Sequence, residues 1–140
     1  MNSTIGALEE TIEWHRDIRA LFSTYNRTDD LGIALAIALV REEIKELEVE
    51  LAYLESTEEA DEALRAQVAK EACDVIVVLA QLAKSVGFDL STALRAVNYS
   101  NQTKLLGAII REDGKLQKGP FYKKPDPSDL ILRVDSKNKL

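Results

Sequence analysis

The chain has 140 residues, of which 46% are hydrophobic and 30% charged, enough for one domain with a hydrophobic core. Its net charge of −6 argues against a nucleic-acid polymer as a partner. A single cysteine, Cys73, excludes an internal disulfide framework and indicates a reducing compartment. The first residues lack a basic signal region, and the longest apolar run, residues 31–40, falls well short of the ~20 residues that span a bilayer. We therefore expect a cytoplasmic protein with no membrane partner.

The first expected helix covers residues 5–22, with apolar side chains along one stripe at Ile5, Leu8, Ile12 and Ile18. Trp14 lies off this stripe, and His15 is the only histidine. Residues 23–30 are polar and turn-like. They offer three caps for the next helix: Thr28, Asp29 and Asp30.

Two long helices are predicted on either side of a turn near Ser56–Glu59. Their apolar residues recur at alternating steps of three and four, the pattern of a buried helix seam. The seam residues are Ile33, Ile37, Val40, Ile44, Leu47, Leu51 and Leu54, then Val68, Ala72, Val75, Leu79, Leu82 and Val86. Ser56-x-x-Glu59 has the form of a capping box for the second of these helices, and Gly87 is expected to end it.

Two acidic pairs flank this seam. Glu43 and Glu46 are three residues apart, as are Glu71 and Asp74, so each pair shares a helix face. In an antiparallel hairpin, Glu43 lies opposite Asp74 and Glu46 opposite Glu71. Four half-buried carboxylates repel one another unless a cation neutralises them, and hard oxygen ligands suit Mg²⁺ or Mn²⁺. The alternative is an ordinary charged hairpin with outward-facing acids, which would normally place Lys or Arg opposite Glu.

A fourth helix is expected over residues 90–106, capped by Asp89. Ile109–Ile110 followed by Asp113–Gly114 predicts a short extended piece and a turn. Residues 117–140 are expected to be irregular apart from a candidate short element at Leu130–Val134. The sequence therefore predicts an all-α protein, with a four-helix-type bundle as the core of a single domain (about 5–106) and an irregular C-terminal tail.

The acidic motif resembles that of a known family. Glu42-Glu43-x-x-Glu46 followed by Glu71-x-x-Asp74 is similar to the EExxE…ExxD signature of the all-α nucleoside triphosphate pyrophosphohydrolases, including MazG-like proteins, dimeric dUTPases and phosphoribosyl-ATP pyrophosphohydrolase. The resemblance to MazG-like single-domain proteins extends to Ser100–Lys104, Asp113–Lys115, Lys118–Pro120 and Pro125–Asp126. It covers about residues 30–130.

The resemblance implies a homo-oligomeric enzyme, a dimer or tetramer, that hydrolyses nucleoside triphosphates to monophosphates and diphosphate with Mg²⁺, for which Mn²⁺ could substitute. It implies that Glu43, Glu46, Glu71 and Asp74 are the metal ligands. Glu42 would be a general base or an outer ligand; the alternative is a solvated acid on the helix face. The preferred base stays open between dUTP and a purine nucleotide such as dGTP or GTP.

The resemblance also implies that Asn101 and Lys104 bind substrate, with Lys104 on phosphate and Asn101 on sugar or base. The alternative for Lys104 is a lysine that complements the helix dipole. Weaker substrate-binding candidates are Trp14, His15, Asn98, Lys118 and Tyr122; for Trp14 and His15 a packing role is the alternative. A different class of function also stays open, namely a non-enzymatic helical oligomerisation module with a structural cation site.

Overall fold

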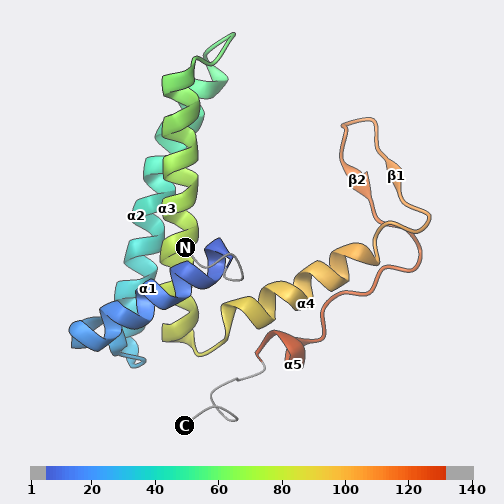
Figure 1. Ribbon diagram of the computed structural model, residues 1–140. Helices are drawn as coiled ribbons and strands as arrows, with labels where there is room; N and C mark the ends of the chain where they lie inside the picture. Colours follow the sequence, from blue (N-terminus) through green and yellow to red (C-terminus); the bar gives the residue numbers. More distant parts are fainter. Residues whose placement is uncertain (1–5, 132–140) are drawn as a thin grey trace. The chain divides into compact units, whose positions relative to one another are not determined.

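A computed structural model describes residues 6–131, and these are mostly helical (Figure 1). The all-α expectation is therefore confirmed at this level. The chain divides into two compact units, one ending at Val86 and the other beginning at Gly87. No helix within residues 6–131 has an apolar stretch long enough to cross a membrane. The expectation of one domain stays a prediction.

The first unit contains α1 (Ala7–Leu21), the 3₁₀ helix η1 (Ser23–Asn26), α2 (Asp30–Glu55) and α3 (Glu62–Val86). Of the three caps considered for α2, Asp29 is the one used: its carboxylate accepts a hydrogen bond of 3.0 Å from the backbone N–H of Gly32. A Cβ on Gly32 would lie 2.3 Å from the carbonyl oxygen of Arg27, so this close entry into α2 requires glycine.

The hairpin of α2 and α3 dominates this unit, and the two helices run antiparallel, side by side (Figure 1). The capping box expected at Ser56–Glu59 is wrong. Ser56 ends α2, and its hydroxyl donates to the carbonyl of Tyr53 at 3.1 Å. Helix α3 begins later, after Asp61, whose carboxylate accepts from the backbone N–H of Leu64 at 2.8 Å. The free carbonyls at the end of α2 thus take the serine hydroxyl, and an aspartate caps the next helix.

Small or polar side chains make up the buried part of this unit. Among the described residues up to Val86, the buried apolar ones are Ala36, Val78, Ala80 and Ala83. The seam is less buried than the sequence pattern predicts: Ile37, Ile44 and Leu51 on α2 are each 38–39% exposed. A two-helix hairpin covers only one strip of each helix, so the edges of both apolar stripes remain open to solvent.

Two buried polar side chains of this unit join its elements. The His15 ring of α1 lies 2.6 Å, through Nε2, from the carbonyl oxygen of Val77 on α3. Gln81 of α3 donates from Nε2 to the carbonyl oxygen of Tyr25 in η1 at 2.9 Å. Both side chains are almost fully buried, so α1 and η1 are fixed to α3 by specific hydrogen bonds as well as by apolar contact.

The second unit contains α4 (Leu90–Gln102), β1 (Ile109–Ile110), β2 (Leu116–Gln117) and α5 (Pro127–Leu130). Asp89 caps α4 as expected, accepting from the N–H of Thr92 at 2.8 Å. The helix ends at Gln102, four residues before the expected end. The extended piece and turn are confirmed as a hairpin pairing Ile109 with Gln117 and Ile110 with Leu116, with Gly114 at φ 85°. Helix α5 ends at Leu130, and the element expected at Leu130–Val134 falls mostly on residues 132–134, which lie outside the described part.

Hydroxyl groups of the motif at Ser100–Lys104 hold the following chain against the end of α4. The Ser100 hydroxyl donates to the carbonyl of Lys123 at 2.7 Å, and the Thr103 hydroxyl accepts from the N–H of the same lysine at 2.9 Å. The N–H of Gly119 donates to the carbonyl of Lys104 at 2.9 Å. A Cβ on Gly119 would lie 1.9 Å from the carbonyl oxygen of Leu106, so only glycine fits this approach.

Candidate metal centre

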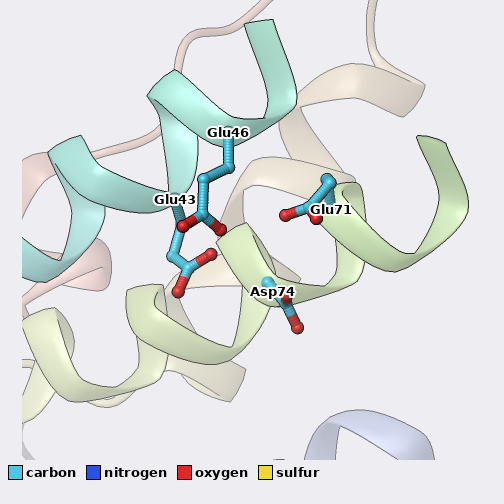
Figure 2. Close-up of side chains that lie close together, drawn as sticks. All are labelled: Glu43, Glu46, Glu71 and Asp74. Atoms are coloured by element: carbon cyan, nitrogen blue, oxygen red, sulfur yellow. The ribbon is translucent and has the colours of Figure 1, made fainter. Parts of the chain in front are cut away.

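Four carboxylates meet where the middle of α2 faces the middle of α3. One oxygen from each of Glu43, Glu46, Glu71 and Asp74 lies within 4.8 Å of the other three. Figure 2 shows the two glutamates of α2 reaching toward the acids of α3. The i, i+3 spacing puts each pair on one helix face, and the antiparallel hairpin brings the two faces together. The sequence prediction that these four acids meet is confirmed.

Two oxygens of this acidic cluster are buried without a hydrogen-bond partner among the described residues, Oε2 of Glu71 and Oε2 of Glu43. The Glu71 side chain is only 6% exposed. Its other oxygen, Oε1, accepts from Nε2 of Gln67 at 3.0 Å and from Nζ of Lys70 at 3.3 Å. A buried carboxylate oxygen with no donor is costly, and a cation placed between the acids would remove that cost.

The surroundings of Glu43 raise the pKa of its carboxyl group. Burial raises the pKa of the Glu43 carboxyl above its usual value, and contact with Glu46 and the negative charges of Asp74 and Glu42 raise it further. The site therefore favours any species that adds positive charge, whether a proton or a metal ion. Glu42 itself is exposed on α2 and contributes to the field at the cluster.

Lys70, which is not among the site residues predicted from the sequence, supplies a positive charge to the cluster. Its Nζ lies 2.9 Å from Oδ2 of Asp74 and 3.3 Å from Oε1 of Glu71. The two carboxylates raise the pKa of Lys70 above its usual range. The side chain is nevertheless 60% exposed. The i, i+4 spacing of Lys70 and Asp74 was the sequence signal that could have revealed this pair.

The residues present fit a metal ion. All the donors are carboxylate oxygens, which suit a hard cation, and two of the oxygens have no other partner. One lysine against four acids leaves the cluster with an excess of negative charge. The cluster can therefore hold a metal ion, which would satisfy the unpartnered oxygens and offset the repulsion between the acids.

Three of the proposed substrate-binding residues come together in the second unit. Nζ of Lys118 lies 4.2 Å from the centre of the Tyr122 ring, and Nζ of Lys104 lies 5.7 Å from it. Both distances are within the range of cation–π contacts. Two ammonium groups on one ring form a local concentration of positive charge suited to an anion. Asn98 and Asn101 are exposed on α4.

Trp14 and His15, proposed for substrate binding with packing as the alternative, have different surroundings. His15 is 3% exposed, and burial lowers its pKa, which favours the neutral ring in the interface between α1 and α3. Its Nδ1 has no hydrogen-bond partner among the described residues. Trp14 is 52% exposed, with its ring edge-on to His15 at 5.0 Å between centroids. The contacts of His15 are those of a packing residue, whereas Trp14 presents an open aromatic surface.

A cavity of about 420 Å³ lies between α4 and the segment leading into α5. No motif of the sequence indicates this cavity, and none of the proposed substrate-binding residues lines it. Its walls carry the basic side chains of Arg95, Lys123 and Lys124 and the acidic side chains of Asp126 and Asp129. The volume is that of a small-molecule site, but the mixed charge of the walls does not select one class of ligand.

Comparison with known proteins adds no family assignment, because no family model and no curated protein matches the chain. The resemblance to the all-α nucleoside triphosphate pyrophosphohydrolases therefore stays a prediction from the sequence motifs.

Proposed function

We propose that this protein is a metal-dependent nucleoside triphosphate pyrophosphohydrolase that uses Mg²⁺, with Mn²⁺ able to replace it. The observation that carries the proposal is the meeting of four carboxylates with two buried, unpartnered oxygens. An ordinary charged hairpin would pair these acids with lysine or arginine across the two helices. Here acid faces acid, which is the arrangement that a divalent cation requires.

In this proposal Glu43, Glu46, Glu71 and Asp74 hold the cation. The bound ion would neutralise phosphate oxygens and lower the pKa of a water molecule. Glu42, exposed beside the cluster, is the candidate to accept a proton from the attacking water.

Two lysines of the second unit, Lys104 and Lys118, would bind the phosphates of the nucleotide. Lys104 and Lys118, which share the Tyr122 ring, offer two ammonium groups to phosphate oxygens. The exposed amide of Asn101 would bond to the sugar or the base. Trp14 is the candidate to stack on the base, since half of its surface is free. The base could be uracil or a purine.

The proposed enzyme is a cytoplasmic homo-oligomer, a dimer or tetramer, whose subunit core is the predicted four-helix-type bundle. Ile37, Ile44 and Leu51 lie seven residues apart on α2 and remain more than a third exposed. Such a row is typical of a helix face that a further helix covers. Sedimentation velocity would measure the mass, and a monomer at all concentrations would contradict this part of the proposal.

The activity is tested by incubating the protein with a panel of NTPs and dNTPs and Mg²⁺ or Mn²⁺, then separating the products by chromatography. We expect a monophosphate and diphosphate, with no products when EDTA is present. Glu46→Ala should abolish product formation because it removes a ligand, whereas Glu48→Gln, which removes an exposed charge from the same helix, should keep it. Release of orthophosphate and a nucleoside diphosphate would contradict the assignment.

A second candidate, a non-enzymatic helical oligomerisation module with a structural cation, is favoured by the exposed apolar row on α2. It predicts that a divalent cation raises the melting temperature while no nucleotide is hydrolysed, even at high protein concentration. The same panel, combined with thermal unfolding, separates the two candidates.

A further inference from the structure

The acidic cluster contains a resident positive charge that the proposed chemistry does not use. The ammonium of Lys70 contacts the carboxylates of Asp74 and Glu71 at 2.9 and 3.3 Å, the two acids that α3 contributes to the cation site. Nζ is the nearest positive charge to the cluster that the described residues provide. In the absence of a metal ion it therefore offsets part of the repulsion between the four acids.

A divalent cation and this ammonium compete for the same oxygens. A metal ion binds carboxylate oxygens at about 2.0–2.2 Å and repels a neighbouring ammonium, so the two cannot share Asp74 and Glu71 on equal terms. The Lys70 side chain can leave without any change in the backbone. It is 60% exposed, and its four-carbon stem is flexible. By contrast, Glu71 is nearly buried and fixed by Gln67, so the acid stays while the lysine moves.

We infer that Lys70 has two positions, one that neutralises Asp74 and Glu71 in the metal-free protein and one at the edge of the loaded site, where it binds a phosphate group of the ligand. Lys70 thereby weakens binding of the free cation and strengthens binding of the phosphate that follows. This inference rests on the cation site of the proposed function and assigns that site a phosphate-binding residue.

The stem of Lys70 sets the reach of this second position. The side chain starts on α3 one residue before Glu71 and one turn before Asp74, so its ammonium remains tethered beside the cation wherever it moves. A cation held by carboxylates attracts a phosphate group. An ammonium tethered beside that cation adds a second, charge-assisted contact to the same phosphate.

The test begins with calorimetric titration of Mn²⁺ into the EDTA-stripped full-length protein without nucleotide. We expect Lys70→Gln to bind Mn²⁺ about fivefold more tightly than wild type, because a charge of +1 beside the cation is removed in a water-like, salt-screened surrounding. Lys70→Arg keeps the charge and should bind Mn²⁺ like wild type. Lys84→Gln should also match wild type, since it removes an exposed charge of the same helix about 21 Å away along its axis.

The second titration adds inorganic diphosphate to the same proteins saturated with Mg²⁺. Here Lys70→Gln should bind about tenfold more weakly, the loss expected for one charge-assisted hydrogen bond, and Lys70→Arg should retain most of the affinity. Opposite changes in the two titrations are the signature of a residue with two positions. A lysine that only stabilises α3 would alter the melting temperature and neither affinity.

Each contrary result has its own meaning. An unchanged Mn²⁺ affinity in Lys70→Gln, with a wild-type protein that does bind Mn²⁺, overturns the inference and leaves the cation site standing. Tighter Mn²⁺ binding with unchanged diphosphate binding overturns the second position of Lys70. Failure of the wild-type protein to bind Mn²⁺ at all overturns both the cation site and the inference built on it.

Discussion

Replacing Glu71 by glutamine should make the metal-free protein more stable and remove its response to metal. Glutamine keeps the shape of the side chain and its acceptor for Gln67, while its amide donates into the cluster where Glu71 has an unpartnered oxygen. Like charges at the 4.8 Å span of the cluster cost about 0.9 kcal/mol per pair in a water-like dielectric. Three such pairs outweigh the attraction of Lys70 at 3.3 Å, so the net relief is about 1–2 kcal/mol.

The assay is thermal unfolding of wild type and Glu71→Gln, each with EDTA and with MnCl₂. In EDTA the variant should melt about 4 °C higher, from the usual ratio of unfolding free energy to melting temperature for a chain of this size. At a Mn²⁺ concentration of ~100 times the dissociation constant, wild type should gain about 2.7 kcal/mol and become the more stable of the two. The order of stability should therefore reverse with metal.

Glu48→Gln is the matched control, because it removes one exposed acid of α2 outside the cluster and should preserve the wild-type response to Mn²⁺. A Glu71→Gln protein that is less stable than wild type in EDTA would show that repulsion between the four acids does not destabilise the metal-free protein. Equal stabilisation of wild type and the variant by Mn²⁺ would show that Glu71 is not a metal ligand.

Further predictions concern the pH dependence of stability, the exposed Trp14 and Gly119 of the second unit. Because the pKa of Glu43 is raised in the folded state, the folded protein takes up a proton on this carboxyl at a higher pH than the unfolded chain does. The free energy of unfolding of the metal-free protein should therefore rise as the pH falls from 7 toward the unfolded pKa of 4.5. In denaturant titrations, Glu43→Gln should not show this rise. Fluorescence of Trp14, the only tryptophan, should change when a hydrolysable nucleotide's monophosphate product is added, and an unchanged spectrum at saturation would exclude stacking on the base. Gly119→Ala should weaken the second unit by about 2 kcal/mol or more, since its Cβ would overlap a backbone carbonyl, and hydrogen exchange should accelerate at the amide of residue 119, which donates to the carbonyl of Lys104. Gly114→Asn, at a positive φ but in open space, should leave that exchange rate nearly unchanged.

The acidic cluster could be predicted because it depends only on helix geometry and on one turn. Residues three apart share a helix face, and an antiparallel hairpin converts two such pairs into one site. The turn between the helices is harder to predict, because Ser56 and Asp61 both suit a helix cap. Sequence alone does not show that the Ser56 hydroxyl bonds to a carbonyl at the end of α2 while Asp61 caps α3. The position of the turn does not change which acidic pairs face each other, because the apolar seam also sets the register of the two helices.

Other features depended on contacts that spacing does not reveal. The exposed fractions of Ile37 and Ile44 depend on what covers α2, whereas their periodicity shows only that they share a face. Lys70 was overlooked because an exposed lysine on a helix is ordinarily a solvated charge. The early end of α4 follows from Ser100 and Thr103, whose hydroxyls bond to the backbone of Lys123, a residue distant in sequence.

Anomalous diffraction at the manganese edge, from crystals grown with Mn²⁺, would show directly whether Glu43, Glu46, Glu71 and Asp74 together bind a divalent cation. We predict an anomalous peak between α2 and α3, about 2.0–2.2 Å from oxygens of these four carboxylates, with Nζ of Lys70 displaced from Asp74. Crystals with no peak at the cluster, in which the Lys70–Asp74 contact persists at millimolar Mn²⁺, would contradict it.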